Sequence, residues 1–208
     1  NAMPRFLAVY TMKPEDLAVL EISSFQLEQI TISPNIAAIL NITPNHLDRH
    51  GTMEAYTAAK TRILEFQAKS DIAVLGRDDK GAWNLRNKVH GKLFTFSLHE
   101  LDEGLDGAYY QDGLLNLRDG NAYLPLILRE KVLLRGDHNV ANVLAAFAIG
   151  HVAGFQLDAM LEAVEDFRGV QHRLELVREL NGVRWYNNSI ATAPERTIAV
   201  IRAFDEPI

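Results

Sequence analysis

The chain of 208 residues contains no cysteine. This absence excludes disulfide bonds, thiol nucleophiles and zinc–thiolate centres, and it is typical of a protein in a reducing cytoplasm. No apolar run approaches the roughly 20 residues that a membrane-spanning helix requires. Positive charge is also scarce, because 21 Lys and Arg residues face 27 Asp and Glu residues, which gives a formal net charge of −6. That balance argues against a broad nucleic-acid-binding surface, although a local basic patch could still hold phosphate groups.

The composition that remains is that of an ordinary globular protein. Hydrophobic residues make up 48% of the chain and charged residues 23%, the usual balance for a soluble domain. The length suffices for one well-packed domain, or for one domain and part of another. The first residues, NAMPRF, lack the charged and then apolar pattern of a signal peptide, and Asn1 and Ala2 before Met3 resemble a remnant of an expression tag.

Short apolar runs alternate with helical patterns over the first half of the chain. The runs 16–22 and 35–42 lack polar alternation, as expected of strands buried on both faces of a parallel sheet. Strand–helix alternation of this kind predicts an α/β fold with a doubly wound, mostly parallel sheet. The predicted elements are strands at 16–22, 35–42, 71–76 and 92–97, and helices that begin near Ser23 or Ser24, span 52–69 with Thr52 as N-cap, and span 80–89.

The pattern changes in the second half. From 107 to 134, Asp-Gly and Gly-Asn pairs separate short strand-like runs, which predicts antiparallel hairpins added to the sheet. A change of domain is expected near residues 170–175, so we predict a central domain over 3–172 and the first elements of a second α/β domain over 173–208. The later elements are predicted as helices at 138–154 and 157–167, strands at 174–180 and 182–188 joined by Asn181-Gly182, and a helix at 194–204 with proline in its first turn.

Glu21 is the first candidate for a functional side chain. It follows four apolar residues at the end of a predicted parallel strand, and in open α/β sheets ligands bind in the crevice at the carboxyl ends of such strands. An acid in that position commonly holds the magnesium ion of a nucleotide. The alternative is a partly buried glutamate that caps the turn at Ser23 and Ser24.

A second group lies in LNITPNHLDRHG, residues 40–51, directly after the next predicted strand. A surface turn does not need two histidines, an aspartate and an arginine together. His46 is a candidate metal ligand or acid–base group, and an ion pair between Asp48 and Arg49 could orient it. The alternative is a loop bound together by its own salt bridges. A functional role is favoured, because the loop should project into the same crevice as Glu21.

Further candidates each have a plain structural alternative. Lys60 lies one helical turn after Tyr56, where a solvated helix lysine is the usual interpretation. Asn139 and Asn142 lie one turn apart at a predicted helix start, where their amides could read an adenine edge or, more commonly, cap the helix. Arg173 follows a histidine and could clamp a phosphate group.

The order of these motifs resembles that of the Mur ligases. The similar stretches are LEISSFQLE, LNITPNHLDRHG, YTAAK, GDHNVAN, HRLE and NNSIATAPERT, and the resemblance runs from Leu20 to Phe204. Any one stretch would be a weak signal, but their shared order and spacing make a strong one. SSFQLE after the strand glutamate is similar to the branch that adds D-glutamate to UDP-N-acetylmuramoyl-L-alanine.

The resemblance implies an ATP- and Mg²⁺-dependent amide ligase of peptidoglycan synthesis. In the family, ATP phosphorylates a substrate carboxylate and an amino group attacks the acyl phosphate, while two magnesium ions stabilise the charge. Lys60 matches the lysine that the family carbamylates. By resemblance, the metal ligands are Glu21, His46 and Lys60, the catalytic residues are Lys60, His46 and Arg173, the nucleotide contacts are Asn139, Asn142, Arg173 and Asn188, and the substrate side has Asn41, Thr43, Asn45 and Thr192.

Several positions depart from the family pattern. Asn45 stands where the family usually has an aspartate before the histidine, which removes a negative charge beside the metals. Asn188 and Ile190 stand where NDSKATN has an aspartate near the ribose and a lysine, whereas Thr192 keeps the threonine on the amino-acid side. These changes leave D-glutamate specificity open. An amide ligase with another amino-acid acceptor is therefore the first alternative.

The sequence contains no G-x-x-x-x-G-K-[ST] loop, whose backbone amides and lysine hold phosphates. In the family this loop precedes the strand glutamate, so the chain resembles a piece of a longer ligase that is inactive by itself. A catalytically silent Mur-like binding subunit is the second alternative. Because the strand that feeds the loop belongs to the family's sheet, we also expect an exposed edge beside 16–22 and self-association. Lys60 should project toward Glu21 and His46.

Overall fold

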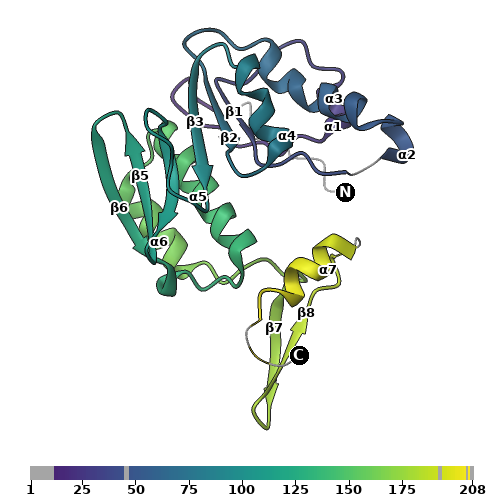
Figure 1. Cartoon of the computed structure of the whole chain (residues 1–208), viewed down its shortest axis with the longest axis vertical. Helices are drawn as coiled ribbons and strands as arrows, with labels where there is room; N and C mark the ends of the chain where they lie inside the picture. The colour runs from purple at the N-terminus through teal and green to yellow at the C-terminus, as the bar shows by residue number, and fades with distance from the viewer. Residues whose placement is uncertain (1–11, 45–46, 192–193, 205, 207–208) are drawn as a thin grey trace.

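The computed structural model describes residues 12–44, 47–191, 194–204 and 206. Its main body is a six-stranded sheet in which the strands stand in chain order (Figure 1). The first four strands are parallel, and the last two add in antiparallel fashion. The strands are β1 (Ile36–Ile39), β2 (Ile72–Gly76), β3 (Lys92–Ser97), β4 (Gly107–Gln111), β5 (Leu114–Asp119) and β6 (Ala122–Leu128).

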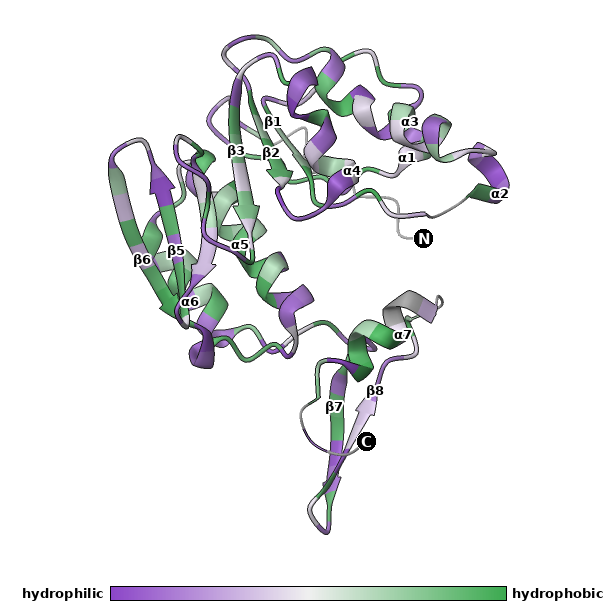
Figure 2. Cartoon of the chain, viewed as in Figure 1, coloured by the Kyte–Doolittle hydropathy of each residue, from purple (hydrophilic) through white to green (hydrophobic). Residues whose placement is uncertain are grey.

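Helices cover both faces of the parallel strands, which confirms the doubly wound sheet. In β2, Ala73 and Leu75 pack into one hydrophobic cluster and Val74 packs into the other. Figure 2 shows hydrophobic residues concentrated on the strands and along α5. No helix in the described part of the chain is long and apolar enough to cross a membrane. One face carries α3 (Met53–Glu65), α4 (Lys80–Trp83) and the 3₁₀ helix η2 (Asn84–Lys88), and the other carries α5 (Asp137–Val152) and α6 (Leu157–Asp166).

The predicted antiparallel hairpins are present in β4 to β6. Asp112 and Gly113 join β4 to β5 with φ values of 50° and 83°, the positive pair that a tight two-residue hairpin turn requires. Pro125 lies in β6, which has only β5 beside it among the described residues. Its missing N–H is tolerated there because an edge strand has one unpaired side. A short 3₁₀ helix, η3 (Arg129–Lys131), leads to α5.

Side-chain caps set where the first helices begin. Ser23 accepts a hydrogen bond from the Gln26 N–H, and the Gln26 side chain accepts one from the Ser23 N–H, so α1 (Ser24–Leu27) starts with a capping box. The Thr52 hydroxyl accepts from the Ala55 N–H at 3.2 Å at the start of α3. Both caps are the predicted ones. Between them lies α2 (Leu47–His50).

The prediction of a strand at 16–22 is wrong. The segment is irregular chain and has no ladder partner among the residues that the structure describes. Leu17, Val19 and Leu20 are 55%, 82% and 62% exposed. A strand requires hydrogen bonds to a neighbouring strand, and among the described residues β1 pairs with β2 alone. The apolar run is typical of a buried strand, but in the structure these residues are exposed to solvent.

A second, smaller unit follows the main body. It contains β7 (Glu175–Leu180), β8 (Val183–Asn187) and α7 (Pro194–Ile201), and it projects away from the six-stranded sheet (Figure 1). Asn181 and Gly182 form its turn with φ values of 52° and 79°, as predicted for a two-residue hairpin. In the described part of the chain β7 and β8 pair only with each other, so a separate sheet begins at Glu175. The domain division between 172 and 173 remains a prediction.

Candidate functional site

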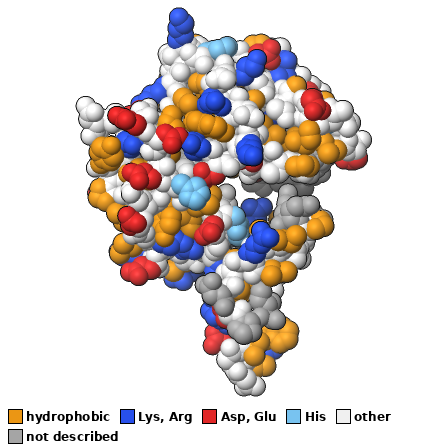
Figure 3. Space-filling model, viewed as in Figure 1, with side chains coloured by type: hydrophobic (Ala, Val, Ile, Leu, Met, Phe, Trp, Pro, Cys, Tyr) orange, Lys and Arg blue, Asp and Glu red, His pale blue; other side chains and the backbone are white. Residues whose placement is uncertain are grey.

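The carboxyl ends of the parallel strands face a hollow between the main body and the β7–β8 unit. Figure 3 shows this hollow with histidine and basic side chains inside it. The loops that leave the strands are tied together at this edge, because the Asp79 carboxylate accepts from the backbone N–H groups of Ile42 and Ala82 at 3.0 and 2.7 Å. One aspartate thus caps α4 and fixes the loop after β1.

The charge of Glu21 reaches Lys60, which lies on a separate element. Glu21 precedes α1, whereas Lys60 lies on α3 with its Nζ 5.4 Å from the centroid of the Tyr56 ring. Burial lowers the pKa of Lys60, and the charge of the Glu21 carboxylate raises it in smaller measure. The net direction is downward, so Lys60 gives up its proton more readily than an ordinary lysine.

The face of α3 that carries Lys60 packs inward. Tyr56 and Ala59 are 5% and 4% exposed, and Lys60 itself is half-buried. The Tyr56 hydroxyl is neutral at physiological pH, as for an ordinary tyrosine, and burial raises its pKa further. The lysine therefore stands beside a fixed neutral ring, and the solvated-lysine alternative does not describe it.

A buried histidine that sequence reasoning missed lies beside these residues. The side chain of His50 is 2% exposed, its Nε2 lies 2.9 Å from the Ser24 hydroxyl, and its Nδ1 lies 3.0 Å from a Glu28 carboxylate oxygen. Serine, histidine and carboxylate in this order are the arrangement of a nucleophilic triad. Ser24 is only 4% exposed, however, so its hydroxyl is not accessible to a substrate. The second histidine of LNITPNHLDRHG was the available signal, but its partners lie far away in the sequence.

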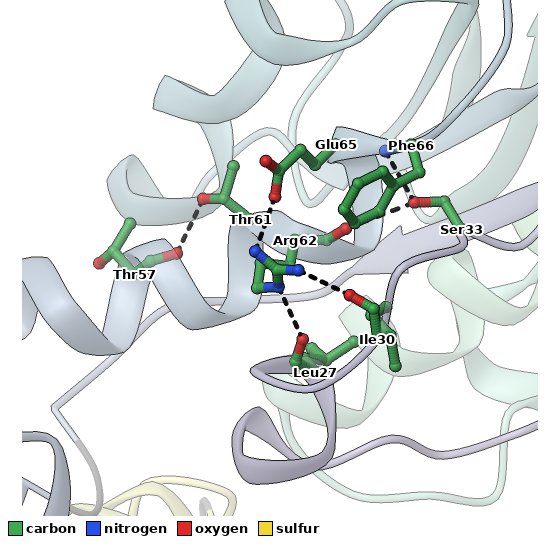
Figure 4. Close-up of polar contacts among 8 residues, drawn as sticks. All are labelled: Leu27, Ile30, Ser33, Thr57, Thr61, Arg62, Glu65 and Phe66. Carbon is green, nitrogen blue, oxygen red and sulfur yellow. Dashed lines mark hydrogen bonds and ion pairs between the residues drawn. The ribbon is translucent and has the colours of Figure 1, made fainter.

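Arg62 holds the other end of α1. Its guanidinium donates to the backbone carbonyls of Leu27 and Ile30 at 3.1 and 2.6 Å and to the Glu65 carboxylate at 3.2 Å (Figure 4). Ser33 bridges to the end of α3, since its hydroxyl donates to the Arg62 carbonyl and accepts from the Phe66 N–H. The segment after Glu21 is therefore fastened to α3 at several points.

The asparagines at the start of α5 do not cap it. Gly136, with φ of 82°, is the N-cap and offers no side chain. The Asn139 amide instead donates to the Arg135 carbonyl at 2.8 Å, and the Asn142 amide reaches the Asn139 oxygen at 3.4 Å. Asn139 is half-buried and Asn142 exposed. The capping alternative is wrong because α5 has no side-chain hydrogen bond at its N-cap, and the Asn139 amide donates to a carbonyl instead of accepting from a free N–H.

Arg173 and Asn188 lie close to the start of α5 through the turn before β7. The positive charge of Arg173 is near enough to lower the pKa of His138, after burial as the larger cause. Asn188 accepts from the Leu174 N–H at 3.1 Å and so supports the turn that carries Arg173, where Leu174 has a φ of 48°. The structure therefore brings Arg173, Asn188 and the first turn of α5 to one region.

Two predictions for the segment after β1 can be compared with the structure. Asn41 and Thr43 are exposed on either side of the buried Ile42. The expected ion pair between Asp48 and Arg49 is wrong for the described residues, since the Arg49 guanidinium lies over the Phe25 ring, 4.0 Å from its centroid. Adjacent residues on a helix point in different directions and do not face each other. The predictions for Asn45, His46 and Thr192 fall outside the described residues.

Glu21 and Lys60 fit part of a magnesium site. In the part of the chain that the structure describes, no three His, Asp or Glu side chains gather closely enough to hold a metal ion. Magnesium prefers carboxylate oxygens, of which Glu21 offers one set, and a carbamate on Lys60 would offer a second. A lysine with a lowered pKa fits that modification, because reaction with CO₂ requires the neutral amine.

Comparison with known proteins supplies the family. Residues 2–150 match the Mur ligase middle domain. A UDP-N-acetylmuramoylalanine–D-glutamate ligase from Thermoanaerobacter sp. (strain X514) is 42% identical over 207 residues, which are 99% of this chain and 45% of that protein. The same-named ligase of Clostridium perfringens is 38% identical over 205 residues, or 99% and 43% of the two chains. The chain thus spans less than half the length of the curated relatives it matches.

Solved structures agree in fold. The UDP-N-acetylmuramate–alanine ligase of Thermotoga maritima matches with a TM-score of 0.61 at 24% identity, over 87% of this chain and 40% of that one. The MurF ligase of the same organism in complex with ADP matches with a TM-score of 0.57 at 22% identity, over 82% and 39%. With the middle-domain match covering most of the described sheet and its helices, this chain belongs to the Mur ligase family.

Proposed function

We propose that this chain is part of a cytoplasmic, ATP-dependent ligase that joins D-glutamate to UDP-N-acetylmuramoyl-L-alanine in peptidoglycan synthesis. The observation that carries the proposal is the match over 99% of the chain to ligases of that name, at 42% identity. Members of the family are ATP-dependent ligases, and one structural neighbour was solved with ADP. The proposal includes a central ATPase domain over 3–172 and the beginning of a C-terminal ligase domain over 173–208.

In the proposed reaction Lys60 works as a carbamate. Its neutral amine nitrogen attacks CO₂, forms an N–C bond and loses a proton, which leaves a carboxylate-like anion. A free ammonium group would repel divalent cations, whereas the lowered pKa increases the fraction of Lys60 that is neutral amine. Glu21, His46 and this carbamate would hold two magnesium ions, which when bound stabilise the charge on the transferring phosphoryl group and on the acceptor carboxylate.

The nucleotide and the substrates are assigned to the two sides of the hollow. Asn139 and Asn142 would face the adenine, and Arg173 would bind phosphate oxygens. Asn188 would lie near the ribose while it supports the Arg173 turn through its hydrogen bond to the Leu174 N–H. The substrate side would be formed by Asn41 and Thr43, which are exposed at the end of β1, together with Asn45 and Thr192.

A direct assay separates this function from its alternatives. The complete protein that contains this chain would be supplied with UDP-N-acetylmuramoyl-L-alanine, ATP and Mg²⁺, and phosphate release would be measured with D-glutamate and with other amino acids. We expect release that depends on D-glutamate. Release with a different amino acid would favour the other-acceptor ligase, for which Asn188 and Ile190 are the reason. No release with any acceptor would favour the silent binding subunit, for which Asn45 is the reason.

The 208 residues alone should not form the amide. They contain no G-x-x-x-x-G-K-[ST] loop and therefore lack the main backbone contacts to the β- and γ-phosphates. We expect weak ATP binding by calorimetry and no ATP-dependent product. Amide formation by the isolated chain would show that the phosphates are held in another way.

The chain alone should also self-associate. Leu17, Val19 and Leu20 are exposed and β1 has a free side among the described residues, and such surfaces tend to pair with another chain. Light scattering over a range of concentrations should show a mass that rises above that of a monomer. A monomer at every concentration would contradict this expectation.

A further inference from the structure

Helix α1, which follows Glu21, is tied to the α2–α3 segment through a buried histidine. His50 lies at the end of α2, and its two ring nitrogens contact Ser24 at 2.9 Å and Glu28 at 3.0 Å. An ionised carboxylate can only accept, so the geometry assigns the Nδ1–H donor toward Glu28 and leaves Nε2 to accept from the Ser24 hydroxyl. Each nitrogen thus fixes a different end of the one-turn helix α1.

Aromatic contacts hold the ring in place. Phe25 of α1 stacks on His50 with a centroid distance of 5.0 Å and an interplanar angle of 6°, and Arg49 covers the Phe25 ring at 4.0 Å. Tyr56 of α3 lies 5.3 Å from His50 at 59°. The imidazole is therefore fixed both in its plane, by its hydrogen bonds, and across its faces, by the neighbouring rings.

The same contacts lead to both proposed metal ligands. On one side Ser24 follows Glu21 by one short extended stretch that ends in the Ser23 cap. On the other side Tyr56 touches His50 and also lies beside the Lys60 ammonium group, 5.4 Å from it. His50 consequently stands between the segment that carries Glu21 and the helix face that carries Lys60.

We propose that His50 is a positioning residue of this site, which sets the placement of Glu21 relative to Lys60 through the Ser24–His50–Glu28 hydrogen bonds and the Tyr56 ring. The inference rests on the proposed function for its effect on turnover, and on the structure alone for its effect on α1. His50 does not touch substrate, nucleotide or metal in this role. It acts as the outer-shell partners of metal ligands do, by fixing the orientation of groups that make the direct contacts.

Arg62 and His50 have separable tasks. Arg62 holds the chain after α1 through the Leu27 and Ile30 carbonyls, at the end far from Glu21. His50 contacts both Ser24 at the start of α1 and Glu28 at its end. Of Arg62 and His50, His50 alone holds the start of α1, the end near Glu21. Loss of His50 should therefore leave α1 attached but able to pivot, which changes the site more than it changes the fold.

The test uses His50→Phe in the complete ligase, with His50→Gln as the conservative variant. Phenylalanine keeps a ring between Phe25 and Tyr56 but removes both hydrogen bonds, whereas the glutamine carbonyl can still accept from Ser24. We expect His50→Phe to lower kcat about 10- to 100-fold while the KM values for ATP and the acyl acceptor change little. His50→Gln should recover part of that loss.

His151→Phe is the matched control. His151 also stacks on a phenylalanine, Phe94 at 5.6 Å, and also contacts a carboxylate, Asp119 at 2.9 Å. It lies at the end of α5, and its hydrogen bond and ring contact among the described residues are to Asp119 and Phe94, not to α1 or α3. The same chemical change there should leave kcat within about twofold, because surface pairs contribute little.

Amide hydrogen exchange on the 208-residue chain gives a readout that does not depend on catalysis. His50→Phe should speed exchange at the α1 amides that bond back to Ser23 and Ser24, and His50→Gln should speed it less. Faster exchange in α1 with no ligase activity in any variant or in the wild type would sink the proposed function and keep the positioning of α1. Unchanged α1 exchange in His50→Phe, or a kcat equal to that of His151→Phe, would overturn the proposal.

Discussion

Lys60 and Lys92 have similar neighbours and opposite electrostatics. Each ammonium group lies 5.4 Å from an aromatic centroid, Tyr56 for Lys60 and Phe94 for Lys92. Lys92 forms a 2.6 Å contact with the Asp119 carboxylate, and this hydrogen bond raises its pKa. Lys60 has no ion pair among the described residues, and burial lowers its pKa. One lysine is stabilised as a cation and the other is not.

The difference follows from the two ends of the sheet. At the end where Lys92 begins β3, Asp119 contacts both Lys92 and His151, and its carboxylate neutralises the charge of Lys92. At the carboxyl ends, Glu21 acts on Lys60 only at a distance that leaves burial as the larger effect. A site that must accept cations or phosphates cannot satisfy its own charges beforehand, and perturbed pKa values gather at such sites. The lowered pKa of Lys60, next to the charge of Glu21, supports the site that we propose at this edge.

The largest expected difference between the two lysines is in catalysis. In the complete ligase, Lys60→Ala should reduce turnover by several orders of magnitude, because it removes a proposed magnesium ligand. Lys92→Ala should leave turnover nearly unchanged, since its partners are all at the other end of the sheet. Steady-state kinetics of both variants, with folding checked by circular dichroism, would measure this. Similar turnover in the two variants would contradict a catalytic role for Lys60 that Lys92 lacks.

A glutamate at position 60 sharpens the same test. Lys60→Glu returns a carboxylate where the carbamate is proposed, although on a shorter side chain, and should recover part of the activity that Lys60→Ala loses. Lys60→Gln has the same length without the charge and serves as the control. Equal activity of the glutamate and glutamine variants would mean that negative charge at this position is not what the reaction uses.

The next largest effect concerns the attachment of α1 to α3, the helix that carries Lys60, through Arg62. Arg62→Ala would leave the Leu27 and Ile30 carbonyls without their charged donor. Hydrogen bonds to charged groups contribute about 1.5–3 kcal/mol each. We therefore expect the free energy of unfolding, measured by urea denaturation, to fall by a few kcal/mol at most. Faster amide exchange should be confined to α1 and α3, and the surroundings of Lys92 should not change. Arg86→Ala is a suitable control, because Arg86 also donates to a backbone carbonyl, but to that of Trp83, which is close to it in the sequence.

Sequence reasoning succeeded where the signal is local. The strand at 92–97 matches β3, Ser23 and Thr52 are the caps, and Asn181-Gly182 forms a hairpin turn. Each depends on a few adjacent residues, since a cap bonds to an N–H three positions on and a tight turn needs positive φ at two positions. The alternation of strands and helices then limits the fold to a doubly wound sheet.

It failed where the partner is distant. The run 16–22 has the composition of a buried strand, but a strand also requires a neighbour, which no property of the run itself reveals. His50 was visible as a histidine, but its contacts to Ser24 and Glu28 exist only after α1 and α2 pack together. The lowered pKa of Lys60 likewise depends on the burial of α3. Residue types in the site could be named in advance, whereas their electrostatic state could not.

The smallest expected effect is on the pH dependence of folding stability, to which the two lysines should contribute with opposite sign. A raised lysine pKa contributes stability that is fully present below the unfolded value of about 10.4 and is lost as pH rises through the higher folded pKa. That is the case for Lys92. A lowered lysine pKa does the opposite, because the folded state disfavours the cation below the folded pKa. For Lys60 this penalty is relieved as pH rises toward about 10.4.

Substitution by methionine, which keeps an unbranched stem, should separate the two windows. Relative to wild type, Lys60→Met should gain stability at neutral pH and lose that advantage as pH approaches about 10.4. Lys92→Met should be less stable than wild type up to that pH, and the deficit should shrink only above it. Each difference should stay below about 1 kcal/mol, because the Lys92 and Asp119 side chains are 45% and 35% exposed and Lys60 is only half-buried. Urea denaturation at closely spaced pH values would measure the free energy of unfolding of each variant. Subtracting the wild-type value at the same pH cancels the contribution of tyrosine titration that the proteins share. If both variants were more stable than wild type at neutral pH, or both less stable, the opposite pKa shifts of the two lysines would be contradicted.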